Sequence, residues 1–388
     1  MKISAPSFAV SGFFDGKAHS IQSQVLAGVD RLERASRTNQ GDLVVRVDGR
    51  RSPPALEFAK TAAFVATGAA AGYTLANLIA QNLMAAQAGL LGIGLGSLLG
   101  IYIAAQAEDS LRQALKAPAW DGKQPVQLGS GPRPASHGQP SNKLKSLLQS
   151  NLRDFPSSRQ VVCLAGHGNH QQVGQLTYDG ISQALQGNPV EQVILDTCLG
   201  GQLEVLARLA PWSKFVLASP QPIPARGLPL EEMFSPAQLA RSPRELAGSW
   251  VEQARPFTPS LAAWDCDQFR HSLLPALDQL GARLTSEMTG DGRSQVRKAL
   301  ARSKNPDRLP SGRVDLGSFL DNLQKSSLSP ETLELAGRAQ QAFQTSLVNR
   351  QNDKTLTFHL GRERDDPGLP SGWRQFLKAA DYRIKPFF

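Results

Sequence analysis

The feature that most constrains the fold is a series of short apolar runs that each stop abruptly at a polar loop. Between residues 142 and 219 the runs RQVVCLAG, EQVILDTC and KFVLAS alternate with stretches of helical periodicity, namely NKLKSLLQSNLRDF, DGISQAL and LGGQLEVLARLA. Strands that alternate with helices indicate a parallel sheet, and near-continuous apolar strands are expected where helices cover both faces. We therefore predict an α/β fold with a mostly parallel sheet flanked by helices, followed by a largely helical C-terminal part.

The ends of these three strands place His167, Cys198 and Ser219 along one edge of the predicted sheet. In such sheets the ligand site lies at the carboxyl ends of the strands. A thiol is a good nucleophile as thiolate, and a nearby imidazole supplies that form and protonates the leaving amine. The backbone N–H groups of Gly168 and Cys198 are candidates for an oxyanion hole. These residue types fit a cysteine nucleophile at this edge.

Two other interpretations stay open from the residues alone. A cysteine after an apolar strand is often a small buried hydrophobe, and a histidine in a glycine-rich loop is often a turn residue. Alternatively, Cys163, His167, His170 and Cys198 could bind zinc. The spacing from Cys163 to His170 is not a familiar ligand pattern, and Cys163 lies within a strand.

Residues 61–107 contain neither a charged residue nor a histidine. The stretch is long enough for two helices of about 20 residues, the length that crosses a bilayer. Gly92, Gly96 and Gly100 recur every four residues and share one helix face, as in membrane helix pairs. We predict an N-terminal apolar α-helical hairpin in a membrane, with both flanks in the cytoplasm because Lys and Arg residues lie on both sides. A soluble Ala/Gly-rich hairpin is the alternative.

These patterns divide the chain into four predicted regions. They are an irregular N-terminal region over 1–60 with one strand at Asp42–Val47, the hairpin over 61–107, a Pro/Gly/Ser-rich linker over 108–142, and the α/β domain over 143–388.

Composition adds expectations about partners and location. The net charge is +9, but the basic residues are spread along the chain and do not interleave with aromatics, so we expect no nucleic-acid partner. Three cysteines are too few for a disulfide framework and indicate a reducing compartment, and the first twenty residues lack the pattern of a signal peptide. We therefore expect membrane association with the α/β domain facing the cytoplasm, or a soluble cytoplasmic protein as the alternative.

The two polar loops resemble the motifs of the clostripain family of caspase-like cysteine peptidases. In that family one strand ends in His-Gly and the next in Asp-Ala-Cys-Leu-Met-Gly, with a glutamate on the following helix. Here Asp196, Cys198 and Glu204 fill the second motif. The stretches SPQPIPARGLPL, SLAAWDCDQF, RVDLGSFLDNL and GWRQFL are similar to further family segments in the same order. The resemblance spans about 145–388 and implies a caspase-like fold.

The resemblance also implies an activity, that of a cysteine endopeptidase acting on protein or peptide substrates. In it Cys198 would be the nucleophile and His167 the general base and acid. Asp196 matches the aspartate at the base of the pocket for a basic side chain, which implies cleavage after Arg or Lys through charge-assisted hydrogen bonds. Ser219 and Gln221 are expected to bind substrate. The chemistry needs no cofactor and no catalytic metal, although calcium is structural in some relatives.

The loop after the third strand departs from the family pattern. Pro220 and Gln221 stand where the family has Gln-Glu, and Arg226 adds a positive charge to the same loop. Two further function classes accompany the peptidase interpretation. One is an inactive caspase-like scaffold, and the other is a membrane-perturbing protein whose hairpin is regulated by the peptidase-like domain.

Overall fold

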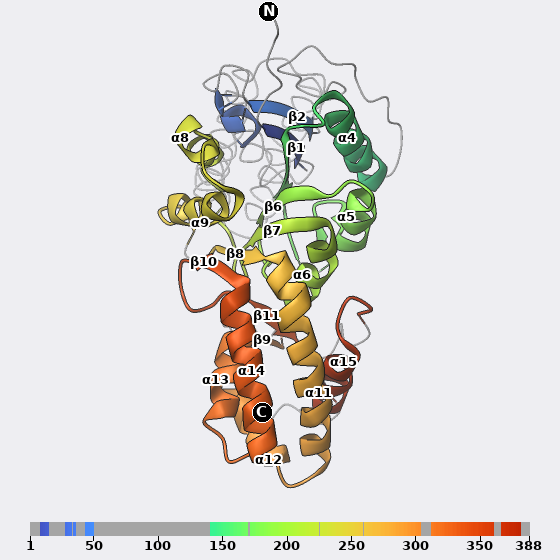
Figure 1. Ribbon diagram of the computed structural model, residues 1–388, viewed down its shortest axis with the longest axis vertical. Helices are drawn as coiled ribbons and strands as arrows, with labels where there is room; N and C mark the ends of the chain where they lie inside the picture. The colour runs from blue at the N-terminus through green and yellow to red at the C-terminus, as the bar shows by residue number, and fades with distance from the viewer. Residues whose placement is uncertain are drawn as a thin grey trace, which may run out of the picture. The chain divides into compact units, whose positions relative to one another are not determined.

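The computed structural model of the protein describes residues 8–14, 28–32, 34–35, 43–49, 140–169, 171–224, 226–258, 260–303, 312–360 and 366–381. Its central sheet contains the strands β1 (Phe8–Phe14), β2 (Leu43–Gly49), β3 (Arg159–Gly166), β6 (Val190–Thr197), β7 (Ser213–Ala218), β8 (Ala262–Asp265) and β10 (Leu347–Arg350). The spatial order is β10-β8-β7-β6-β3-β1-β2 (Figure 1). The pairs from β7 to β2 are parallel, and those of β8 are antiparallel. The predicted mostly parallel α/β sheet is therefore confirmed.

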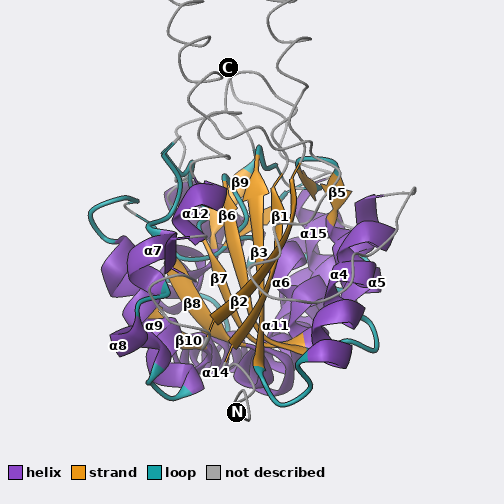
Figure 2. Ribbon diagram, turned by 90° about the horizontal axis from the view of Figure 1, so that it is seen from above, coloured by secondary structure: helices purple, strands orange, loops and turns teal. Residues whose placement is uncertain are grey.

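Helices cover both faces of this sheet, which explains its continuous apolar strands. One face carries α4 (Pro140–Asp154), α5 (Tyr178–Leu185) and α6 (Leu203–Leu209), and the other carries α7 (Leu230–Met233), α8 (Pro236–Leu239) and α9 (Pro243–Ala254) (Figure 2). Because both faces are covered, six consecutive residues are buried in each of the two central strands β3 and β6, without alternation of buried and exposed positions.

The part of the chain after β8 is mostly helical, as the sequence predicts. Its helices are α10 (Cys266–Gln268), α11 (Leu274–Thr289), α12 (Arg293–Arg302), α13 (Leu316–Gln324), α14 (Pro330–Ser346) and α15 (Ser371–Asp381), with a π-helical turn over Phe269–Leu273. Two short antiparallel ladders complete the fold, one of β9 (Arg313–Asp315) with β11 (Thr357–His359) and one of β4 (Gln172–Val173) with β5 (Leu176–Thr177).

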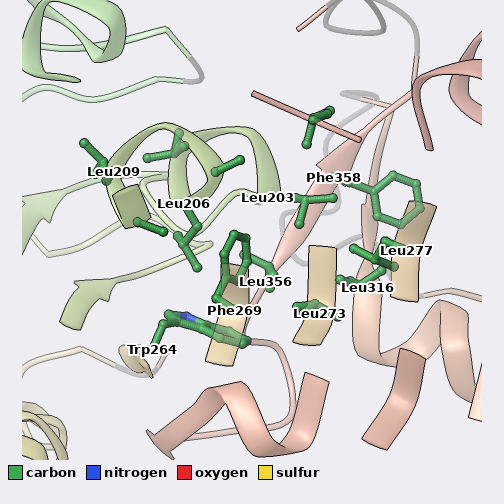
Figure 3. Packing of buried hydrophobic residues seen from close by; sticks show 14 of the residues in the cluster. Leu203, Leu206, Leu209, Trp264, Phe269, Leu273, Leu277, Leu316, Leu356 and Phe358 are labelled. Carbon is green, nitrogen blue, oxygen red and sulfur yellow. The ribbon is translucent and has the colours of Figure 1, made fainter. Parts of the chain in front are cut away.

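One hydrophobic core joins the sheet to these C-terminal helices. Figure 3 shows leucines of α6 gathered with Trp264 of β8, Phe269 of the π-helical turn and Phe358 of β11. Trp264 also meets Phe343 of α14 edge to face, with ring centroids 5.4 Å apart. Since sheet and helices share one core, the C-terminal helices belong to the same domain as the sheet.

The N-terminal strands also belong to this unit. The strand predicted near Asp42 is present as β2, but β1 has no counterpart in the sequence prediction, because its seven residues FAVSGFF are short and carry a serine and a glycine. Ser11 of β1 is buried and accepts a hydrogen bond from Asn151 Nδ2 of α4 at 2.8 Å. The structure thus groups β1 and β2 with the α/β domain, where the sequence predicts a separate irregular region over 1–60. The predicted hairpin over 61–107 lies outside the described residues.

A buried ion pair ties β2 to α4. The Arg46 side chain is 1% exposed, and its Nη2 lies 2.6 Å from the Asp154 carboxylate. The guanidinium also lies over the Phe155 ring, 5.2 Å from the centroid. Arg153 is a second, exposed partner of the same carboxylate, at 2.9 Å. Both arginines hold the pKa of Asp154 below its usual range, Arg153 most strongly, while burial acts the other way.

The substitution Asp154→Ala should lower the free energy of unfolding by about 3 to 5 kcal/mol, because it leaves the Arg46 charge buried without compensation. Arg153→Ala is the matched control and should change stability little, since its side chain is exposed. Urea denaturation of both variants measures the difference. Equal losses in the two variants would show that the buried pair does not hold β2 to α4.

Candidate active site

The pairing of β3 with β6 brings the two motif loops together. Gly166, the last residue of β3, is in register with Thr197, the last residue of β6. His167 and Cys198 are therefore the next residues along two adjacent parallel strands. The Thr197 hydroxyl donates to the Gly166 carbonyl at 2.9 Å and links the two strand ends. The structure places both residues at one sheet edge, as the strand pattern predicts.

Gly168 fixes how closely the two loops approach. A Cβ at this position would lie 1.9 Å from Thr197 Oγ1 and 2.4 Å from the carbonyl oxygen of Cys198, so no larger residue fits. The His167 loop therefore packs directly on the backbone that carries Cys198. The His167 side chain is exposed and Cys198 is half-buried, so a ligand can reach both from solvent.

The turn after Cys198 has a strained backbone. Leu199 has a φ of +62° and is the only residue other than glycine in the left-handed region among those described. The next loop pins this turn, because Gly201 N–H donates to Ser219 O at 2.8 Å. A Cβ on Gly201 would lie 2.5 Å from Pro220 N, so glycine is required there as well. Backbone strain held in this way is typical of functional sites.

The strand β11 holds the same turn from the C-terminal part of the chain. Thr357 N–H donates to Gly201 O at 3.0 Å, and the Thr357 residue forms a parallel bridge with Gln202. His359 N–H donates to the buried carboxylate of Glu204 at 3.1 Å. Sequence reasoning missed this contribution, because nothing local in KTLTFHLG indicates its partner.

Ser219 and Gln221, both predicted to bind substrate, build the loop beside Cys198. Ser219 is completely buried, and its hydroxyl lies 2.6 Å from that of Ser260 and 2.9 Å from the Gln221 carbonyl. The Gln221 carbonyl in turn accepts from Leu199 N–H at 3.3 Å. The Ser219 hydroxyl is directed into these contacts and not toward solvent, which departs from the expected role in substrate binding.

Asp196 lies two residues before Cys198 on β6 and is 8% exposed. Its Oδ1 accepts a hydrogen bond from Leu228 N–H at 3.1 Å. Gly227 has a φ of +68°, and a Cβ there would lie 2.7 Å from Asp196 Oδ2, so glycine lets the loop close over the carboxylate. Burial raises the pKa of Asp196 to about 6, and the Leu228 N–H and the charge of Arg31 act in the opposite direction.

Arg31 is the charged residue near the site that sequence reasoning missed. It belongs to a helical segment between β1 and β2, and its Nη2 donates to the carbonyl oxygen of Arg226 at 2.6 Å. The two residues are 195 positions apart, so no local pattern reveals the contact.

The other two thiols are unlike Cys198. Cys163 and Cys266 are buried, and burial raises the pKa of Cys266 to about 12 and that of Cys163 well above the usual value. Both therefore belong to the core. For the zinc alternative, His170 lies outside the described residues, and the described part of the chain contains no group of three or more metal-ligating side chains of the His, Cys, Asp or Glu types.

A sequence model of the Clostripain family matches residues 135–357. The chain belongs to the clostripain family. The resemblance inferred from the motifs is thereby confirmed, and the protein is a clostripain-family cysteine protease. No curated protein matches the chain.

Solved structures share the fold at low sequence identity. A secreted C11 cysteine protease from Bacteroides thetaiotaomicron is 12% identical with a TM-score of 0.55, and the match covers 92% of this chain and 93% of that one. An inactive zymogen C11 protease from Parabacteroides distasonis is 9% identical with a TM-score of 0.56, covering 98% and 96%. A secreted C11 protease from Bacteroides thetaiotaomicron in complex with an irreversible peptide inhibitor is 11% identical with a TM-score of 0.53, covering 97% and 99%.

These findings contradict the expected location. The sequence predicts a membrane-associated protein with a cytoplasm-facing peptidase domain, or a cytoplasmic one, whereas two of the similar structures are of secreted proteases. Within the described residues, the structure contains no helix with the length and apolar character needed to cross a membrane. The expectation came from the apolar stretch 61–107, which lies outside those residues.

The substitution Gly168→Ala should lower peptide hydrolysis by at least about 100-fold, because the new methyl group separates the loops of His167 and Cys198 by a distance on the order of 1 Å. Gly337→Ala in α14 is the control, since a Cβ there meets open space and alanine favours helix. Hydrolysis rates are compared after circular dichroism confirms folding. Wild-type rates in Gly168→Ala would contradict the close contact.

The raised pKa of Asp196 predicts a specific pH dependence of stability. A carboxyl group whose folded pKa exceeds its unfolded value favours folding below about pH 4, and this contribution is lost as the pH rises through about 6. Relative to Asp196→Asn, the wild type should therefore lose about 2.5 kcal/mol of unfolding free energy between pH 4 and pH 7.5. Chemical denaturation of both proteins at the two pH values measures this difference. A difference independent of pH would show that Asp196 has an ordinary pKa.

Proposed function

We propose that the protein hydrolyses peptide bonds through a dyad of Cys198 and His167. The observation that carries this proposal is the register of β3 with β6, which makes the two residues neighbours just beyond the carboxyl ends of these strands. Membership of a cysteine protease family supplies the reaction type.

The chemistry follows from these positions. The Cys198 thiolate attacks the carbonyl carbon of the scissile bond, and the carbonyl oxygen takes up the negative charge. The backbone N–H groups of Gly168 and Cys198 are the proposed donors to that oxygen. His167 gives its proton to the leaving amine as the thioester forms, then removes a proton from the water that hydrolyses the thioester. No step requires a cofactor, and the structural calcium of some relatives stays an untested prediction for this chain.

Asp196 is the proposed base of the pocket for the residue before the cleaved bond, with a preference for Arg or Lys. Its burial beneath Gly227 and Leu228 supports this role, because a desolvated carboxylate selects a cationic side chain strongly. A similar solved C11 protease is in complex with a peptide inhibitor, which supports a peptide as the ligand of this site. In this proposal Ser219 and Gln221 hold the turn at Leu199 in position.

Labelling with a thiol-reactive peptide that ends in Arg tests the proposal. Wild-type protein should take up one label, and Cys198→Ala should take up none. His167→Ala should slow the reaction by at least about 100-fold, because it removes the acid and base. Intact-protein mass spectrometry counts the labels.

Cys266→Ala is the matched control and should label like the wild type, because the Cys266 thiol is buried and its pKa is about 12. Labels that persist in Cys198→Ala, or peptides of every kind failing to label Cys198, would refute the proposal and favour an inactive scaffold.

A further inference from the structure

We propose that Arg31 determines specificity by acting as an internal counter-ion to Asp196, so that it competes with a basic substrate side chain for this carboxylate. The inference rests on the proposed function, in which Asp196 forms the base of the pocket for the residue before the cleaved bond. Arg31 lies outside both sequence motifs, the one that contains His167 and the one that contains Cys198.

The geometry places the Arg31 guanidinium beside the Asp196 carboxylate. A Cβ built on Gly227 would lie 2.7 Å from Asp196 Oδ2 and 3.4 Å from Arg31 Nη2. The carboxylate oxygen and the guanidinium nitrogen are therefore no more than about 6 Å apart, within the range at which an opposite charge favours the ionised carboxylate. The Arg31 charge lowers the pKa of Asp196 accordingly, against the larger effect of burial.

The segment that carries Arg31 is fixed to the peptidase fold. Val29 and Leu32 are buried in the core, and the Arg34 Nε lies 2.8 Å from a carboxylate oxygen of Glu231. The Arg31 Nη2 bonds to the Arg226 carbonyl, whereas its Nε is buried and makes no hydrogen bond with the described residues. The guanidinium is thus held in place near the carboxylate by a hydrogen bond to a backbone carbonyl.

Arg226, which the sequence singles out as the added charge of this loop, is directed elsewhere. Its Nη2 donates to the Pro256 carbonyl at 2.6 Å, and its guanidinium lies over the Phe257 ring, 4.6 Å from the centroid. Arg226 therefore contributes its carbonyl to the site as the anchor of Arg31. The cation that acts on Asp196 comes from the N-terminal segment.

A substrate Arg or Lys that approaches Asp196 meets a carboxylate whose charge Arg31 already compensates in part. The incoming cation gains less attraction and is repelled by Arg31 at short range. A neutral side chain of the same shape is affected by neither interaction. The wild-type preference for a basic residue should therefore be weaker than the Asp196 carboxylate alone would give.

Two peptides that differ only by Arg or its neutral isostere citrulline, at the position before the cleavage site, test this inference. Their dissociation constants are measured by titration calorimetry on full-length protein carrying Cys198→Ala, so that no turnover is needed. Adding Arg31→Gln should raise the affinity ratio of the Arg over the citrulline peptide by at least about tenfold. Arg31→Lys keeps the charge and should leave the ratio near the wild-type value.

Two further variants complete the design. Arg34→Gln, in the same helical segment, is the matched control and should change the ratio little, because the Arg34 side chain is exposed and the buried Val29 and Leu32 still hold the segment in the core. Asp196→Asn added to Arg31→Gln should bring the ratio close to one, because no charge then distinguishes the peptides.

An unchanged ratio in Arg31→Gln would overturn the inference. An equal increase in affinity for both peptides would also overturn it, because Arg31 would then hinder binding by its size and not by its charge. The absence of binding by either peptide to any variant would overturn it as well. Failure of the proposed function has a different signature, the absence of Cys198-dependent labelling, and the binding measurement does not depend on it.

Discussion

The contact on which the site depends is that of Gly168 with the Thr197 side chain and the Cys198 backbone. Parallel pairing sets Gly166 opposite Thr197, but pairing alone fixes only the strand positions. The missing side chain at Gly168 lets the first loop lie against the second at a distance that any Cβ would prevent. Because helices cover both faces of the sheet, a slip in register would disrupt the close packing of the strands and would also separate the two loops. Stability of the sheet and geometry of the site are therefore set by the same constraint.

The turn at Cys198 is further shaped by segments that are remote in the chain. The left-handed conformation of Leu199 persists because the Ser219–Gln221 loop bonds to the turn on one side and Thr357 of β11 bonds to it on the other. A strained residue needs such surroundings to hold it. The shared hydrophobic core brings β11 to this place, as the C-terminal helices pack on α6 directly after the cysteine loop (Figure 3). The helical C-terminal part thus has a role in the active-site geometry.

Local sequence patterns predict the central strands, most helices and the meeting of His167 with Cys198, because each follows from strand periodicity and parallel pairing. They do not predict β1, whose seven residues give too little periodicity to recognise. They also assign Ser219 to substrate, although its hydroxyl is buried against Ser260. The position of Ser219 directly after β7 shows that it is near the site. Only its contact with Ser260 in the structure shows which way its hydroxyl points.

The charge around Asp196 is the clearest case of a property that local sequence patterns do not predict. Compared with the family pattern, the sequence of the loop after β7 lacks an acidic residue and has the additional Arg226. The sequence therefore suggests that this loop alone changes the charge near Asp196. In the structure the Arg226 side chain packs on Phe257, and its carbonyl instead holds Arg31, which lies 195 residues earlier. A backbone carbonyl has no residue identity, so no motif encodes this contact. The charge near Asp196 is therefore set by the chain's N-terminal segment as much as by the motif that contains Asp196. A motif match transfers the carboxylate without the proposed counter-ion.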